Sequence, residues 1–252
     1  MNNNRTFCIN ENAENINDIF FNEHVNLIKL EDLGDIYDVL YEGEKTNYIL
    51  KMSINKFQHY SIEVKNLEKL KDVKGIPRMY SYGKNSKCKF ILMEKIEADD
   101  LFTLCEKKLF SENTMRDIAR KALKILKIIH KRGVLHLDIK PENILYNEKT
   151  KKVYIIDFEQ RTTVDYCAPE CSGKTTDTIK GDIWSLGITI YCLIMGNYPF
   201  RYLRKGSNEK EIVINNSKIS YELNNLLLHM LDKNIETRYT VDDCLNHSWF
   251  KM

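Results

Sequence analysis

The side chains best suited to chemistry lie in VLHLDIKPENILYN, residues 134–147, and in VYIIDFE, which follows it. The first stretch carries Asp138, Lys140 and Asn143, and the second carries Asp157. A carboxylate can accept the proton of a hydroxyl, and a nearby ammonium group can neutralise negative charge. Carboxylate and amide oxygens suit a hard cation such as Mg²⁺. Asp and Asn in a loop are usually turn formers, but the pattern D-x-K-P-E-N after a long helical stretch favours catalysis.

The order of these motifs resembles the catalytic segment of eukaryotic protein kinases, H-R-D-L-x-x-x-N, then D-F-G, then A-P-E. The corresponding residues here are His136-Leu137-Asp138, then Asp157-Phe158-Glu159, then the triplet APE that ends at Glu170. Several short motifs recur in the family's order at plausible distances, so the match is specific. The resemblance covers about residues 25–252 and implies transfer of the γ-phosphoryl group of ATP. That reaction asks the protein mainly for positioning and charge neutralisation.

The resemblance implies a role for each of the four side chains. Asp138 would orient the substrate hydroxyl, and Lys140 would neutralise charge on the transferred group. Asn143 and Asp157 would hold Mg²⁺, so the expected cofactors are ATP and Mg²⁺.

The resemblance also implies a nucleotide site in the first part of the chain. Lys51 in YILK would pair with the α- and β-phosphates, and Glu63 on the following helix would fix it. Alone, Lys51 would be read as a surface lysine on an edge strand. The expected neighbours of the base, ribose and phosphates are Val39, Met93, Glu94, Ile96, Asp100, Leu145 and Gly34. Without the resemblance, most of these residues would be ordinary strand and core positions.

The acceptor is expected to be a serine or threonine of a protein substrate. Lys140 two residues after Asp138, and Thr163 three residues before Tyr166, resemble the serine/threonine kinases. Kinases of small molecules usually lack the A-P-E motif. Structural roles are implied for Asp182, in GDIWSLG, and for an ion pair between Glu170 and Arg238.

The chain departs from the family pattern around the nucleotide. The phosphate-covering loop should read G-x-G-x-x-G, but LEDLGDIYDV has only Gly34, with Asp32, Asp35 and Asp38 beside it. Carboxylates repel a triphosphate, so either weak nucleotide affinity or a loop held away from the phosphates is expected. The residue Ile49 replaces the small alanine of V-A-I-K and should narrow the adenine pocket.

Two further departures concern regulation. Glu159 replaces the glycine of D-F-G, which removes backbone freedom at that point. Leu137 replaces the arginine that receives an activation-loop phosphate in many kinases, so such a phosphate would order the loop less. Activity without activation-loop phosphorylation is therefore expected. The alternative is a pseudokinase, a binding or scaffold module with weak or no phosphotransfer.

The surrounding pattern predicts an α+β, two-lobed fold. A loosely ordered extension, residues 1–24, is expected to precede a kinase domain at 25–252, with an N-lobe at about 25–95 and a C-lobe at about 96–252. The N-lobe should be a small antiparallel sheet of five strands plus one helix at 59–73. The mainly helical C-lobe should contain a long helix opened by Ser111, an apolar helix at 182–196 and a final helical pair.

Composition bounds the partners and the compartment. The 252 residues are 43% hydrophobic and 29% charged with a net charge of +2, which gives no electrostatic case for nucleic acid or membrane. The seven cysteines form no CxxC pair, which suits a reducing compartment. A polar N-terminus without a signal-peptide core, and no apolar run of membrane-spanning length, predict an intracellular protein, cytoplasmic or nuclear. Nothing in the sequence determines the oligomeric state.

Overall fold

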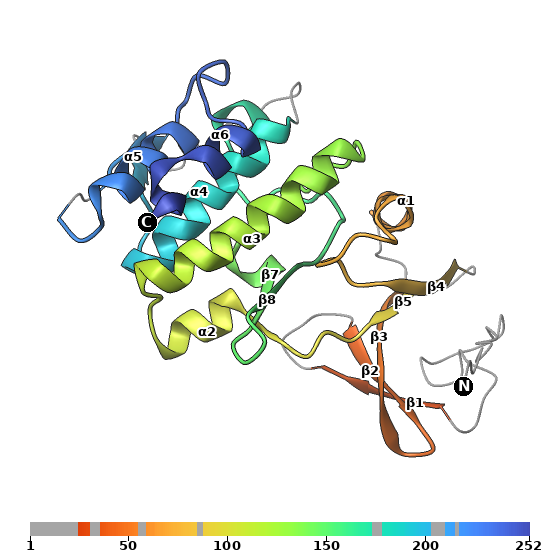
Figure 1. The fold of residues 1–252 in the computed structure, drawn as a ribbon. Coiled ribbons are helices and arrows are strands. Elements are labelled where there is room, and N and C mark those ends of the chain that lie inside the picture. The colour runs from red at the N-terminus through yellow and green to blue at the C-terminus, as the bar shows by residue number, and fades with distance from the viewer. Residues whose placement is uncertain are drawn as a thin grey trace. The chain divides into compact units, whose positions relative to one another are not determined.

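The computed structural model describes residues 25–30, 36–54, 59–84, 88–172, 178–202, 210–214 and 217–252. The chain divides into two compact units (Figure 1). The first unit comprises the residues up to Lys71 together with Pro77–Ile96, and the second comprises Asp72–Ile76 together with Glu97–Met252. The expected extension at 1–24 and Gly34 lie outside the described residues.

The first unit is a five-stranded antiparallel sheet with one helix, α1 (Tyr60–Lys69), as predicted. The strands follow the spatial order β1-β2-β3-β5-β4. The hairpin between β2 and β3 turns at Glu42 and Gly43, which both have positive φ angles, 52° and 81°, as tight hairpin turns require. The strand bounds are β1 (Val25–Lys29), β2 (Ile36–Tyr41), β3 (Glu44–Ile54), β4 (Met79–Lys84) and β5 (Cys88–Glu94).

The two faces of this sheet differ in chemistry. One face carries a buried hydrophobic cluster of seven residues: Tyr37, Val39, Leu50, Met52, Cys88, Phe90 and Leu92. Successive side chains of a strand point to opposite faces, so Ile49 and Lys51 lie on the other face with their cross-strand partners Met93 and Ile91. Asp38 is opposite Ile49 in the register, and the pairing shifts immediately after Asp38. Asp38 therefore shares the face of Lys51.

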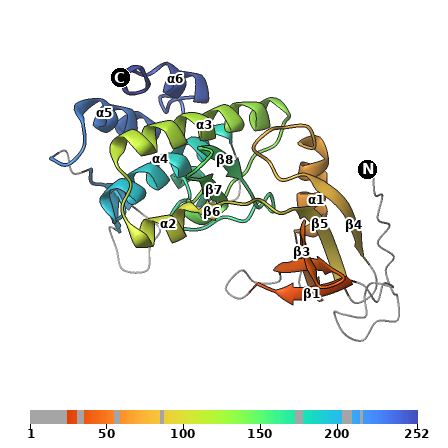
Figure 2. The ribbon, with the colours of Figure 1, turned by 60° about the horizontal axis from the view of Figure 1, so that its bottom comes forward.

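Helices form most of the second unit. Ser111 caps α3 (Glu112–Lys131) by accepting a hydrogen bond from the backbone N of Thr114, and one face of α3 is buried at helical spacing. The helix α4 (Ile179–Met195) packs against α3 and is buried almost all round, as expected for a central helix (Figures 1 and 2). The predicted final helical pair is α5 (Tyr221–Met230) and α6 (Val241–Asn246).

Short elements complete the second unit. A three-stranded sheet has the order β6 (Asp99–Asp100), β7 (Ile144–Asn147), β8 (Lys152–Ile155). Two elements were not predicted from the sequence: the helix α2 (Leu101–Lys107) and the small hairpin of β9 (Phe200–Tyr202) and β10 (Lys210–Ile212). Single turns of 3-10 helix lie at Pro141–Asn143, Pro169–Ser172 and Ser248–Lys251.

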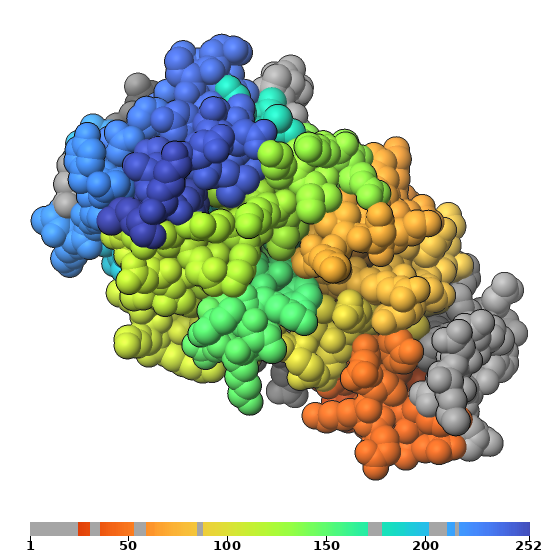
Figure 3. Space-filling model, in the orientation of Figure 1, coloured from red at the N-terminus to blue at the C-terminus, as the bar shows by residue number. Residues whose placement is uncertain are grey.

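The surface of the second unit shows the outer side of α3 (Figure 3). The C-terminal residues flank it on one side and the hairpin of β7 and β8 on the other. In the described parts of the chain, no helix combines the length and the apolar character needed to cross a membrane.

Candidate active site

Asp138 is the centre of a hydrogen-bonded cluster in the second unit. Its Oδ1 accepts a hydrogen bond from the backbone N of Thr163 at 3.0 Å, and its Oδ2 accepts one from Asn143 Nδ2 at 3.2 Å. Lys140 Nζ lies 3.1 Å from Asp138 Oδ2 and donates to Thr163 Oγ1 at 3.0 Å. Asp138 is only 5% exposed. The structure therefore brings together the proton acceptor, the ammonium group and the amide that the sequence singled out.

Asp182 of α4 holds the loop that carries Asp138. Its Oδ1 accepts a hydrogen bond from Leu137 N at 2.7 Å, and its Oδ2 accepts one from His136 N at 3.0 Å. His130 Nε2 of α3 lies 2.8 Å from the same Oδ2. Leu137 has a φ angle of 66°, a conformation that costs about 1–3 kcal/mol in a non-glycine residue. The buried Asp182 carboxylate fixes this strained residue directly before Asp138.

His136 links the loop to the segment that contains Asp157. Its Nδ1 accepts a hydrogen bond from Asp138 N at 3.2 Å, so the proton is on Nε2, which donates to Ile156 O at 2.8 Å. The imidazole also contacts the ring of Phe158 edge to face, with centroids 4.9 Å apart. These contacts place the residues on both sides of Asp157 against the loop.

Asn143 and the Asp157 segment are joined through the backbone, because Ile156 N donates to Asn143 O at 3.0 Å. The amide nitrogen of Asn143 is engaged by the Asp138 side chain and by Asp138 O at 2.8 Å, which leaves the amide oxygen as the ligand atom. That oxygen and the Asp157 carboxylate are hard donors of the kind that Mg²⁺ prefers. The donor set therefore fits the metal that the sequence analysis expected.

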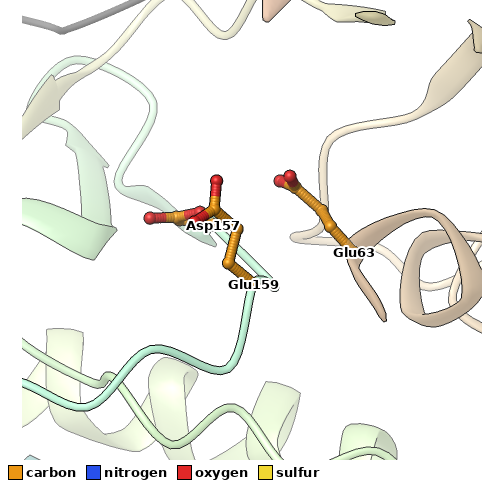
Figure 4. Close-up of side chains that lie close together, drawn as sticks. All are labelled: Glu63, Asp157 and Glu159. Atoms are coloured by element: carbon orange, nitrogen blue, oxygen red, sulfur yellow. The ribbon is translucent and has the colours of Figure 1, made fainter. Parts of the chain in front are cut away.

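Glu159 stands two residues after Asp157, where the family pattern has glycine, and both side chains come from the segment after β8 (Figure 4). Glu159 is buried, and its carboxylate lies 3.7 Å from the guanidinium of Arg161. Asp157 has a φ angle of 68°, so the backbone of this segment is strained at the predicted metal ligand.

In the first unit, Lys51 and Glu63 form the ion pair that the sequence analysis expected. Lys51 Nζ lies 3.0 Å from Glu63 Oε1. Glu63 belongs to the first turn of α1 (Figure 4) and is 1% exposed. Because solvent screens a buried ion pair only weakly, this pair fixes the position of the Lys51 ammonium on its face of the sheet.

The first-unit residues expected around the base do not all lie on the same face of the sheet. Met93 shares the sheet face of Lys51, whereas Val39 lies in the hydrophobic cluster on the opposite face. Asp38 occupies the position on the Lys51 face that the sequence analysis gave to Val39. The backbone N–H of Glu94 is already used, since it donates to Arg78 O at 2.8 Å. Ile96 follows β5 and is half-buried.

Asp100 and Leu145 in the second unit are cross-strand neighbours in β6 and β7. Asp100 also caps α2, because its Oδ1 accepts from Thr103 N at 2.8 Å and its Oδ2 from Thr103 Oγ1 at 2.7 Å. This capping role was not predicted from the sequence, nor was the ion pair of Asp38 with Lys95, whose Nζ lies 2.7 Å from Asp38 Oδ1. Asp38 belongs to β2 and is 57 residues away from Lys95, so no local pattern in the sequence indicates the pair.

The expected ion pair between Glu170 and Arg238 is present in the second unit. Arg238 NH1 and NH2 donate to the two oxygens of Glu170 at 2.5 and 2.9 Å. The guanidinium is buried and lies over the ring of Trp184, 5.0 Å from its centroid. This bidentate pair anchors the APE triplet to α4 and to the segment before α6.

The fold and these side chains define a protein kinase domain. The sequence model of the protein kinase domain family matches residues 32–250, so the chain belongs to that family. A solved structure of the kinase PK-1 from Cydia pomonella granulovirus has a TM-score of 0.75 at 19% identity, covering 90% of this chain and 95% of that one. That likeness confirms the protein kinase fold.

Relatives with similar sequences include serine/threonine kinases. Calcium-dependent protein kinase 4 of Plasmodium falciparum is 28% identical over 272 residues, covering 93% of this chain and 51% of the relative. Serine/threonine-protein kinase kin-29 of Caenorhabditis elegans is 29% identical over 227 residues, covering 79% of this chain and 28% of the relative. The chain thus spans about half the length of the first relative and less of the second.

Proposed function

We propose that this protein is a serine/threonine protein kinase that transfers the γ-phosphoryl group of ATP to hydroxyls of protein substrates. The observation that carries the proposal is the cluster of Asp138, Lys140, Asn143 and Thr163. Each oxygen of the Asp138 carboxylate has a fixed donor, and the ammonium of Lys140 is held beside it. A scaffold that only binds a partner has no need of this arrangement.

Each side chain then has a defined task. The Asp138 carboxylate accepts the proton of the substrate hydroxyl and orients its oxygen. Lys140 neutralises the charge that develops on the transferred group. Asn143 and Asp157 hold Mg²⁺, and bound Mg²⁺ with ATP supplies the phosphoryl group and the neutralising charge. Lys51, fixed by Glu63, binds the α- and β-phosphates, while Met93, Glu94, Ile96, Asp100, Leu145 and Gly34 are assigned to the rest of the nucleotide.

The choice of serine and threonine as acceptors has two supports. The Lys140 ammonium is hydrogen-bonded to Thr163, and these are the two residues whose spacing resembles serine/threonine kinases. The relative kin-29 carries that activity in its name.

Activity without activation-loop phosphorylation is part of the proposal. Thr163 already donates its backbone N–H to Asp138, so the loop contacts the catalytic carboxylate without a phosphate. Leu137 stands where an arginine would receive that phosphate. Protein expressed in cells that lack kinases, and then treated with phosphatase, should keep its activity. Activity that disappears on this treatment would reject this part of the proposal.

The test of the main proposal is a radiolabelled-ATP assay on generic serine- and threonine-containing protein substrates. Asp138→Asn and Asp157→Ala should each lose at least about a thousandfold in kcat, since each removes a charge that acts in the transition state. The matched control is Asp72→Asn, which changes an exposed aspartate paired with Arg132. Wild type no more active than both site variants would establish the alternative, a pseudokinase. The features that favour this alternative are the glycine-poor loop, Ile49 and Glu159.

A further inference from the structure

The ion pair between Asp38 and Lys95 lies on the sheet face that carries Lys51. Lys95 Nζ is 2.7 Å from Asp38 Oδ1 and 2.9 Å from Oδ2. The carboxylate belongs to β2, and the ammonium belongs to the residue directly after β5. The backbone N of Lys95 donates to Asn47 O at 3.0 Å, which ties this residue to the start of β3. The side chain of Asp38 is 11% exposed and that of Lys95 is 23% exposed.

The register places this pair beside the residues assigned to the base. Asp38 is directly opposite Ile49, and Ile49 is directly opposite Met93. Directly paired residues on neighbouring strands have Cβ atoms about 5 Å apart. A purine ring that lies against Ile49 on this face therefore also meets the Asp38 carboxylate.

A carboxylate at that position is unfavourable for base binding. Pockets for small ligands are mostly apolar, and the face of an aromatic ring is negative. The base would have to desolvate a buried ion pair or displace Lys95 from it, and either event opposes binding. An apolar residue at the same position would instead offer a surface for stacking.

We propose that the Asp38–Lys95 ion pair determines the nucleotide affinity of this kinase by forming a polar surface against the base, so that adenine binds weakly. The inference rests on the proposed nucleotide site in the first unit. The ion pair weakens binding of the base, whereas the glycine-poor loop weakens binding of the phosphates, so the two effects are distinct.

The test replaces both partners in one variant, Asp38→Val/Lys95→Met. This variant removes one negative and one positive charge, so a change in affinity cannot come from net charge. It also leaves no bare buried charge, which a single Lys95→Met change would do. The variant Asp72→Val/Arg132→Met is the matched control, because it removes an exposed ion pair in the second unit, where Arg132 NH2 lies 2.8 Å from Asp72 Oδ2.

Binding of ATP with Mg²⁺ and of adenosine is measured by isothermal titration calorimetry on wild type and both variants. The Asp38→Val/Lys95→Met variant should bind both ligands about tenfold more tightly, which corresponds to about 1.4 kcal/mol. The control should match wild type. A second variant, Asp38→Asn/Lys95→Gln, keeps both side chains polar and should tighten adenosine binding about threefold, because neutral amides are less costly to desolvate.

The outcomes separate this inference from the proposed function. One outcome overturns the inference and leaves the kinase proposal intact: wild type binds ATP, but neither Asp38 variant binds adenosine more tightly than wild type does. Tighter ATP binding without tighter adenosine binding also overturns it, since adenosine lacks phosphates. No binding of either ligand by any of the proteins overturns the nucleotide site itself, and the inference with it.

Discussion

Two residues of the candidate site have strained backbones, and each is held by its neighbours. Leu137 and Asp157 have φ angles of 66° and 68°. The strained conformation of Leu137 is stabilised by the hydrogen bond from its N–H to Asp182. The same carboxylate also accepts a hydrogen bond from His136 N. Strained residues persist only where the surroundings over-determine them. Asp182 therefore positions Asp138 through the backbone of the preceding loop residues.

Asp182→Asn should destabilise the protein and reduce its activity. Asparagine has one acceptor oxygen in place of two. It therefore cannot keep the hydrogen bonds with Leu137 N, His136 N and His130 Nε2 together. We expect a loss of about 2–4 kcal/mol in the free energy of unfolding, measured by urea denaturation. The control Thr189→Val removes one neutral hydrogen bond on the same helix, from Thr189 Oγ1 to Ser185 O, and should cost about 1 kcal/mol. Equal losses in the two variants would contradict the positioning role.

Thr163 offers a test at the proposed catalytic cluster around Asp138. Thr163→Val removes the hydroxyl that accepts from Lys140 Nζ but keeps the shape of the side chain and the backbone N–H that donates to Asp138. Lys140 would lose an oriented acceptor worth about 1–1.5 kcal/mol, so kcat should fall about tenfold. Thr163→Ser keeps the hydroxyl and should retain most of the activity. Equal kcat values for the two variants would show that this contact is not used in turnover.

At the scale of elements, the first turn of α3 anchors the C-terminal end of the chain. Glu112 accepts hydrogen bonds from Ser220 N at 3.0 Å and from Trp249 Nε1 at 2.7 Å. Partial burial acts to raise the pKa of Glu112, but the hydrogen bonds from Ser220 and Trp249 outweigh it and hold the pKa below its ordinary value of 4.5. The charged carboxylate is thus favoured in the folded state.

The Glu112 contacts predict how stability depends on pH. Because the folded-state pKa is lowered, the contribution of Glu112 is fully present above pH 4.5 and is lost as the pH falls through the lower folded value. Wild type should therefore lose more stability than Glu112→Gln between about pH 6 and pH 3, measured by urea denaturation at each pH. Ser220→Ala removes one donor and should give an intermediate slope. Parallel curves for wild type and Glu112→Gln would contradict this account.

The order of elements could be predicted from the sequence, because strand alternation and helical spacing are strong in both units. Ser111 marked the start of α3, where it is the N-cap. The face of β2 could not be predicted. A shift of one residue moves every side chain to the other face, and the pairing of Asp38 with Ile49 places Asp38, not Val39, on the face of Lys51. That register depends on pairing between strands, which no local pattern in the sequence fixes.

Contacts between segments far apart in the sequence could not be predicted either. Gly75 lies beyond the end of α1 at Lys69, and its main constraint is tertiary. It has a φ angle of 89°, and an added Cβ would lie 2.5 Å from Ile125 Cδ1. Its carbonyl accepts from Ile155 N at 2.8 Å, within the second unit. The pair of Asp38 and Lys95 is separated by 57 residues, and no local pattern predicts it.

At the scale of the whole molecule, stability comes mainly from the hydrophobic core of each unit. The first unit has the cluster around Leu50 and Met52, and the second has one around Trp184 and Ile188. Exposed ion pairs such as Lys121 with Asp117 contribute about 0.2–1 kcal/mol each. A ligand that binds only the folded state adds RT ln(1 + [L]/Kd) to the free energy of unfolding, where [L] is the free ligand concentration.

Removal of Mg²⁺ should therefore be visible in the thermal unfolding of the whole protein. ATP at a hundred times its Kd adds about 2.7 kcal/mol to the free energy of unfolding, and the proposed metal ligands Asn143 and Asp157 should make that gain depend on Mg²⁺. Differential scanning calorimetry of wild type with ATP should show a higher Tm in MgCl₂ than in EDTA. For Asp157→Ala the two Tm values should converge, because one carboxylate ligand is missing, while the Tm without ATP serves as the internal control for folding. A wild-type Tm that rises equally in MgCl₂ and EDTA would place nucleotide binding outside the proposed metal site, since only a site built on Asn143 and Asp157 requires the cation.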